Sequence, residues 1–210
     1  MTPRYPPDPE HAFRDVPEDD KGEYWRWFST GSVALDFLKA YPSAKSKAAT
    51  HLDLADSNLT VWNLGRWLLA ADLVPYPTPV VSKSDSLEAQ ALSEIGMRLV
   101  AAHVRARPFG NKDLIALNKI AAGSTPIPLL TNDGFIWSPS TLMAGLAVVA
   151  RDLVELLGRS SSDQIRQCAA CEAYFLDTSK SRRRRWCSMK GCGNASKVNA
   201  FNMRKRQDSQ

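Results

Sequence analysis

All four cysteines of this 210-residue chain lie near its C-terminal end: Cys168, Cys171, Cys187 and Cys192. Two residues separate the first pair, fifteen separate the pairs, and four separate the second pair. This spacing lets four thiolates surround one ion, and a set of four cysteine ligands leaves no open coordination position, so the sequence predicts one structural zinc ion. Buried free thiols and a redox Cys-x-x-Cys pair are the alternatives. The redox pair would need a preceding thioredoxin-like strand, which is not predicted.

Basic residues surround these cysteines. Residues 163–210 carry 11 Lys and Arg against 4 Asp and Glu, a net charge of +7, whereas residues 1–162 carry 16 against 18, a net charge of −2. A run of four arginines falls between the cysteine pairs, where we expect the second arm of a hairpin: Arg182, Arg183, Arg184 and Arg185. Guanidinium groups bind phosphate in bidentate fashion, so this run predicts a nucleic-acid contact, with a solvated basic stretch as the alternative.

A basic helix is predicted from Asn194 onward, with Asn194 as its N-cap. Val198 and Phe201 lie three residues apart and are expected to pack on the zinc knuckle. Trp186, next to Cys187, is expected to cover the metal site rather than to stack on a base.

Another face of this helix carries Asn199, Asn202 and Arg206 at i, i+3 and i+7. Asparagine pairs with adenine and arginine with guanine in the major groove, so we expect this face to read bases. The nucleic-acid contacts predicted on the helix are Lys197, Asn199, Asn202, Arg204 and Arg206. Ordinary solvated asparagines are an equal alternative, because no pattern fixes how the helix docks.

The composition, with 44% hydrophobic and 23% charged residues, is that of a globular protein. The longest apolar run, residues 142–150, is too short to span a bilayer, and the first twenty residues lack the apolar stretch of a secretory signal. We therefore expect a cytoplasmic protein without membrane contact, in which the cysteines are metal ligands or thiols rather than disulfides.

A shift in composition beside residues 158–162 predicts a boundary between two folded parts. We expect a flexible proline-rich arm over residues 1–23, a mainly α-helical domain over 24–158, and a zinc finger over 163–210. Helical periodicity and breakers predict helices from about 64 to 71 before Pro75, from an Asp85–Glu88 capping box to 106, from an Asn111 cap to 121, and from Ser138-Pro139 to Gly158. A small β-hairpin is predicted over 129–137, around Asn132-Asp133-Gly134.

The order of motifs in the C-terminal part resembles the CGNR zinc-finger family. It comprises the strand-like Tyr174-Phe175-Leu176-Asp177-Thr178-Ser179, the arginine run, Trp186-Cys187-Ser188-Met189 and Cys192-Gly193-Asn194. The upstream part is similar to that family's helical partner, the ABATE domain, at Ala34-Leu35-Asp36-Phe37, Met97-Arg98 and Leu117-Asn118. The resemblance implies a treble-clef-like zinc finger with four cysteine ligands that binds DNA and a helical domain that senses a small ligand, in a stress-induced transcription regulator.

Arg98, at the margin of an apolar stripe, and Asn118, one turn after Leu114 and expected to point inward, are the candidate ligand-binding residues. The alternative is a structural role, in which Arg98 and Asn118 form hydrogen bonds with each other and with the backbone. Two positions depart from the family motifs: Ala195 replaces the arginine after Cys-Gly-Asn, and Lys39-Ala40 replace Asn-Thr. The first removes a cation that the resemblance places toward nucleic acid. The second alters the first motif of the helical domain, and with it the ligand pocket that the resemblance implies.

We therefore expect a DNA-binding regulator and not an enzyme. The small footprint of one finger favours a homodimer. A zinc-stabilised RNA-binding or protein-adaptor module without a small ligand is the first alternative. A metal-dependent nuclease is the weakest, because the zinc segment offers neither an open coordination position nor a histidine.

Overall fold

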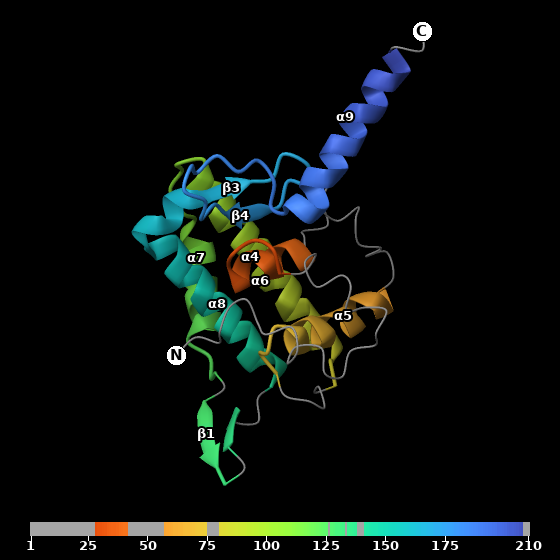
Figure 1. Cartoon of the computed structure of the whole chain (residues 1–210). Coiled ribbons are helices and arrows are strands. Elements are labelled where there is room, and N and C mark those ends of the chain that lie inside the picture. Colours follow the sequence, from red (N-terminus) through yellow and green to blue (C-terminus); the bar gives the residue numbers. More distant parts are fainter. Residues whose placement is uncertain are drawn as a thin grey trace.

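The computed structural model describes residues 28–41, 57–74, 80–125, 127–132, 134–137 and 141–207, and it confirms a mainly α-helical chain (Figure 1). The helices of the body are α4 (Val33–Ala40), α5 (Ser57–Ala70), α6 (Lys83–Val104), α7 (Asn111–Ala121) and α8 (Leu142–Gly158). None of the described helices is both long and apolar enough to cross a membrane. The arm predicted over residues 1–23 lies outside the described residues.

The C-terminal unit continues directly from α8. Its elements are a 3-10 turn η2 (Ser160–Gln164), strands β3 (Ile165–Gln167) and β4 (Tyr174–Leu176), a π-helical turn η3 (Met189–Gly193) and α9 (Asn194–Gln207). β3 and β4 form an antiparallel hairpin, and a helix follows the second cysteine pair, which confirms the treble-clef-like arrangement.

All four predicted helix starts of the body differ from the structure by a few residues. α5, expected from about residue 64, begins at Ser57. The box that opens α6 joins Ser82 and Asp85, not Asp85 and Glu88: the Ser82 amide donates to Asp85 Oδ2 at 2.8 Å, and the Asp85 amide donates to Ser82 Oγ at 3.2 Å. Asn111 is the first residue of α7 and caps nothing, since the N-cap is Gly110. The last helix of the body begins at Leu142 behind a Thr141 cap, while Ser138 and Pro139 lie outside the described residues.

The core forms where α4 and α8 meet α6. Five successive residues of α4, from Ala34 to Leu38, are buried, so this short helix is enclosed on nearly all sides. Gly96 of α6 permits the close crossing, because a Cβ atom there would lie 2.7 Å from Leu38 Cδ2 and 3.1 Å from Leu153 Cδ2.

The predicted hairpin is present as β1 (Pro128–Thr131) and β2 (Gly134–Trp137). The pairing of Thr131 with Gly134 leaves a two-residue turn, and the φ of +114° at Gly134 is a conformation that favours glycine. The hairpin extends away from the helical body (Figure 1).

The finger and the body share one core. Ile165 of β3 and Tyr174 of β4 belong to the same buried cluster as the helices of the body. The Leu176 amide donates to the Thr30 carbonyl oxygen at 2.6 Å, so β4 is also tied by its backbone to the segment before α4. Two parts predicted as separate domains are therefore coupled through their packing.

Arg151 of α8 binds the end of α7. Its guanidinium donates to the carbonyl oxygens of Ala121 (2.7 Å) and Gly123 (2.9 Å) and to Thr125 Oγ1 (2.9 Å). We expect Arg151→Ala to lower the free energy of unfolding by about 1–2 kcal/mol, because these carbonyls lose a charged donor at an exposed site. Urea unfolding measures the change. Lys119→Ala, which removes an exposed cation of α7, should change the stability by less than about 0.5 kcal/mol, and equal losses would contradict the role of Arg151.

Candidate metal centre and basic surface

The hairpin β3–β4 positions the first cysteine pair. The Cys168 amide donates to the Ala173 carbonyl oxygen at 2.8 Å, and the Glu172 amide donates to the Cys168 carbonyl oxygen at 3.0 Å, which closes the turn that presents Cys171. Cys187 follows the arginine loop, and Cys192 lies in η3. Cys168 and Cys187 are buried, whereas Cys171 and Cys192 are half-buried.

The four sulfur atoms fit a tetrahedral zinc site. All four Sγ atoms lie within 4.8 Å of one another, and Cys187 Sγ is 3.8 Å from Cys171 Sγ and 3.7 Å from Cys192 Sγ. Ligands at the usual Zn–S distance of about 2.3 Å stand about 3.8 Å apart in a tetrahedron. These cysteines hold one structural zinc ion, as the sequence predicts.

The four thiols lie so close together that each affects the pKa of the others. Hydrogen bonds from Cys171 and Cys187 lower the pKa of Cys168, while desolvation and the neighbouring thiols raise the pKa of Cys192 to about 12. Hydrogen bonding to Cys168 raises the pKa of Cys187, and the positive charge of Lys39 acts in the opposite direction. The site therefore favours a divalent cation that neutralises several thiolates together.

Aromatic and arginine side chains enclose the metal centre. Phe175 is fully buried against the cysteines, and Trp186 packs on the same cluster, as predicted. Arg184 donates to the Cys187 carbonyl oxygen at 2.6 Å, and its guanidinium carbon lies 5.0 Å from the Phe175 ring centre. Arg185 lies over Trp186 at 5.5 Å.

Asp177 holds the loop that carries the arginine run. This buried carboxylate accepts from the Ser179 amide (3.1 Å), the Ser179 hydroxyl (2.6 Å) and the Arg184 amide (2.9 Å). Burial acts to raise the pKa of Asp177, but these hydrogen bonds outweigh it and lower the pKa below its usual range.

The arginines do not lie on a strand, so the prediction of a hairpin arm is wrong: residues 182–185 form an irregular loop, and Arg182 has a φ of +49°. Arg182, Arg183 and Arg185 are exposed, and Arg184 is half-buried and bonded within the finger. Three of the four thus face solvent.

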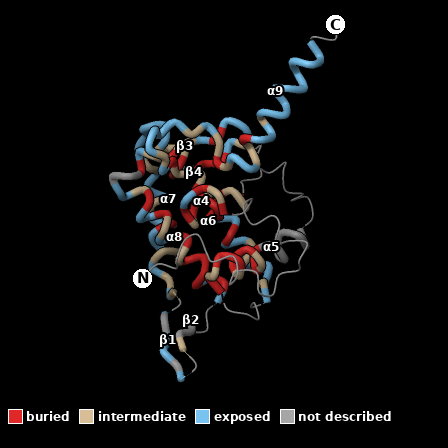
Figure 2. The backbone as a smooth tube through the Cα atoms, in the orientation of Figure 1, coloured by how far each residue is buried: buried red, intermediate tan, exposed pale blue. Residues whose placement is uncertain are grey.

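The structure corrects two predictions about α9. Asn194 is not an N-cap, because η3 runs directly into α9; Ser188 caps η3, and the Asn194 amide group donates back to the Lys190 carbonyl oxygen. Val198 and Phe201 do not pack on the knuckle, since they are 56% and 61% exposed. α9 projects from the molecule (Figure 2). All five nucleic-acid candidates of this helix are exposed: Lys197, Asn199, Asn202, Arg204 and Arg206.

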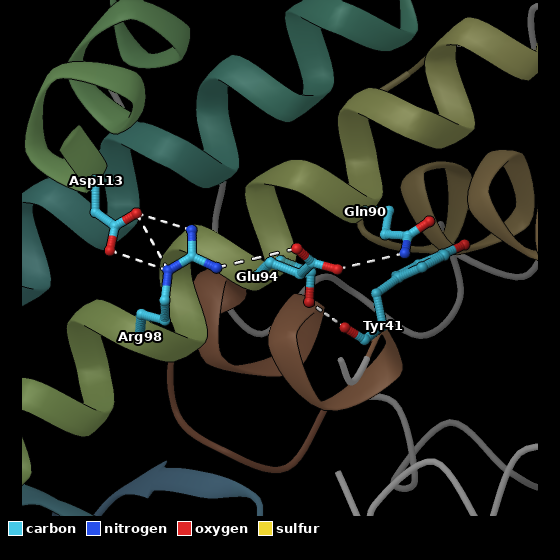
Figure 3. A network of polar contacts seen from close by, with 6 residues as sticks. Tyr41, Gln90, Glu94, Arg98 and Asp113 are labelled. Atoms are coloured by element: carbon cyan, nitrogen blue, oxygen red, sulfur yellow. Dashed lines mark hydrogen bonds and ion pairs between the residues drawn. The ribbon is translucent and has the colours of Figure 1, made fainter. Parts of the chain in front are cut away.

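The candidate ligand residues do not meet in a buried site. Arg98 is exposed and forms a bidentate ion pair with Asp113 of α7, with N–O distances of 2.8 and 3.0 Å, and a longer contact of 3.9 Å to Glu94 (Figure 3). Hydrogen bonding to Asp113 raises the pKa of Arg98 and lowers that of Asp113. Asn118 is exposed, so the prediction that it points inward is wrong. Their binding of a ligand stays a prediction.

Asp36 of α4 is a buried carboxylate whose importance the sequence did not reveal, although it stands inside an apolar run. Its Oδ1 accepts from the amides of Ser29 and Thr30, both at 3.0 Å, whereas its Oδ2 has no hydrogen-bond partner in the described part of the chain. Thr30 in turn accepts from Leu176 of the finger. Asp36 therefore fixes the segment that joins the body to β4.

Asp152 of α8 completes this junction. Its Oδ2 accepts from the Ser32 hydroxyl at 2.6 Å and from the Ala34 amide at 2.9 Å, at the positive N-terminal end of α4. Desolvation raises the pKa of Asp36 to about 8, and the charge of Asp152 adds to the effect, while Lys39 and the hydrogen bonds from Ser29 and Thr30 oppose it.

We expect Asp36→Asn to remove a pH dependence of stability. The ordinary pKa is 3.8 and the folded pKa is about 8, so between these values the folded chain holds a proton that the unfolded chain releases, and stability falls as the pH rises. Asparagine keeps the accepting oxygen without the charge. In urea unfolding, the variant should gain about 2–4 kcal/mol relative to wild type between about pH 5 and pH 8. Parallel pH curves would contradict this expectation.

Comparison with known families agrees with this architecture. A family model described as "ABATE: Putative stress-induced transcription regulator" matches residues 31–160, and one described as "CGNR zinc finger" matches residues 164–205. A comparison with curated proteins finds no match. The first range covers more than half of the chain and ends next to the metal centre, where the second begins. The chain belongs to the ABATE family and carries a CGNR zinc finger at its C-terminal side.

Proposed function

We propose that this protein is a transcription regulator that binds duplex DNA through the zinc finger and α9, and that its helical domain senses a small ligand. The observation that carries the DNA-binding part is the charge of the finger. From residue 178 to 207 the chain has ten Lys and Arg and no Asp or Glu. These cations lie on the loop between the cysteine pairs, on η3 and on α9, which projects from the molecule (Figure 1). Such a surface is complementary to the phosphates of nucleic acid.

The two basic segments have different tasks in this proposal. The exposed arginines of the loop, Arg182, Arg183 and Arg185, contact phosphates and set the register of the complex. α9 enters the major groove, where Asn199, Asn202 and Arg206 are candidates for reading base edges. Zinc holds the arginine loop and the start of α9 together. Arg184 stabilises the same region through its hydrogen bond to the Cys187 carbonyl oxygen.

Ligand sensing rests on the family description and on the junction at α4. A ligand that prefers one arrangement of the helical domain would shift the population of that arrangement. The Thr30 amide donates to Asp36, and the Thr30 carbonyl oxygen accepts from the Leu176 amide, so these hydrogen bonds offer a physical route by which such a shift reaches the finger. Arg98 and Asn118 remain the candidate ligand contacts, and Lys39-Ala40 mark where this chain differs from the family motif. A homodimer would extend the small footprint of one finger.

The proposal makes the protein a binding protein and not an enzyme. Four cysteine ligands fill the coordination of a structural zinc ion, and all three histidines of the sequence lie outside residues 163–210. Metal-assisted hydrolysis uses an open metal position or a nearby general base such as histidine, and the four-cysteine finger offers no open position and no histidine.

Competition among nucleic acids tests the proposal. The zinc-loaded full chain is bound to a labelled DNA duplex, and unlabelled duplex DNA, single-stranded DNA and hairpin RNA are added in turn. We expect duplex DNA to compete at a concentration about tenfold lower than the others at physiological salt. Preference for RNA would support the RNA-binding alternative, and absence of binding to any nucleic acid would favour a protein adaptor.

A further inference from the structure

α9 carries an uncovered face whose centre is partly apolar. Four residues at i, i+3, i+4 and i+7 share this side of the helix and are called here the Val198 face: Val198, Phe201, Asn202 and Lys205. No residue of α9 is buried, and Val198 and Phe201 are more than half exposed. The described body therefore does not cover this face, which leaves valine and phenylalanine side by side and available for contact.

Cations stand on both sides of the Val198 face. By the helical period, Lys197 and Arg204 lie along one flank and Arg206 along the other, and all three are exposed. A second copy of α9 laid against this face would bring these cations close to their own copies, and α9 itself contains no acidic residue to offset them. The charge pattern instead fits a partner with anionic edges and an apolar, hydrogen-bonding interior.

The major groove of duplex DNA has these properties. Phosphates line both of its edges, and its floor presents thymine methyl groups together with donors and acceptors of the bases. α9 has 14 residues and is therefore about 21 Å long, with a diameter of about 10–12 Å that suits a groove about 12 Å wide. α9 projects away from the body, so the described part of the body leaves the helix accessible (Figure 1).

We infer that the Val198 face lies toward the bases of the major groove and that Val198 and Phe201 contact thymine methyl groups. This inference rests on the proposed function and makes it more specific. The side of α9 that contacts the bases is then centred on the Val198 face and not on the neighbouring face of Asn199 and Arg206. Asn202 belongs to both faces. The expected consequence is a preference for thymine that depends on its methyl group.

Deoxyuridine substitution tests the inference directly. The zinc-loaded full chain is titrated with a mixed-sequence duplex rich in A·T pairs, and with the same duplex in which deoxyuridine replaces thymidine and removes only the methyl groups. Wild type should bind the thymidine duplex about fourfold more tightly for each methyl group buried, which corresponds to about 0.8 kcal/mol. The variant Val198→Ala/Phe201→Ala should bind both duplexes alike.

Met203→Ala is the matched control, because Met203 is equally exposed but lies on the opposite side of α9. It should keep the preference for the thymidine duplex. The inference is overturned if wild type binds both duplexes equally, or if the preference persists in the double alanine variant. It is also overturned if that variant changes only the sedimentation of the protein, since the face would then be an interface between copies. Failure of wild type to bind either duplex would instead refute the proposed function itself.

Discussion

Replacing Cys187 by serine is expected to release zinc and to destabilise the helical body as well as the finger. Zinc binding supplies about 10–16 kcal/mol of apparent folding free energy to small fingers, and this finger has few buried residues besides its cysteines. Ile165 and Tyr174 connect it to the common core. Once the hairpin loses its metal, these side chains lose their fixed positions. We expect the helical body to stay folded but to lose about 3–5 kcal/mol, which is about 10 °C in melting temperature.

Zinc content by atomic emission and thermal unfolding by circular dichroism measure this effect. A chelator added to wild type should reproduce it, whereas Thr178→Ala, at an exposed position of the finger, should leave both readouts unchanged. Backbone NMR signals of residues 163–207 should lose their dispersion without metal. Signals that stay dispersed, or a variant that melts like wild type, would show that the body and not the metal holds the finger.

Neutralising the exposed arginines of the loop is expected to have the largest effect on DNA binding. Arg182→Gln/Arg183→Gln/Arg185→Gln removes three phosphate contacts if all three engage DNA. The slope of log K against log salt should then become less steep by about 2.7, and affinity near physiological salt should fall by about a hundredfold. The loss should be similar for all duplex sequences, because phosphate contacts carry no base information.

The matched control removes the same charge from the body. Arg107→Gln/Lys112→Gln/Lys119→Gln changes three exposed cations and should leave the salt slope unchanged. Equal losses in both triple variants would mean that net charge alone governs binding. Arg184 is left unchanged in the first variant, because its hydrogen bond to the Cys187 carbonyl oxygen stabilises the fold of the finger.

The metal centre could be predicted from the sequence because its chemistry is local. Cysteine spacing reflects a turn and a hairpin, and the structure brings the four sulfur atoms together as expected. The hairpin of β1 and β2 and the ends of α5 and α8 were predictable for a similar reason, since glycine and proline act on their own neighbourhood.

The burial and contacts of individual side chains were less predictable than the metal centre, because they depend on what packs against each element. Periodicity placed Val198 and Phe201 on one face of α9 but could not show that no described element covers it. Asn118 shares the apolar side of α7 in sequence spacing, yet α7 lies at the surface and buries only Leu117. The role of Asp36 could not be predicted, because its hydrogen-bond donors are the backbone amides of Ser29 and Thr30, and backbone contacts do not depend on residue type.

Selection from a pool of random duplexes tests the central claim most directly. The zinc-loaded full chain is used at physiological salt, and the enriched sequences are compared with scrambled versions of themselves. A DNA-binding regulator should enrich a shared sequence and bind it on the order of 10³-fold more tightly than the scrambled duplex. If no sequence is enriched, or if selected and scrambled duplexes bind alike, the finger is not the DNA-reading part of a transcription regulator.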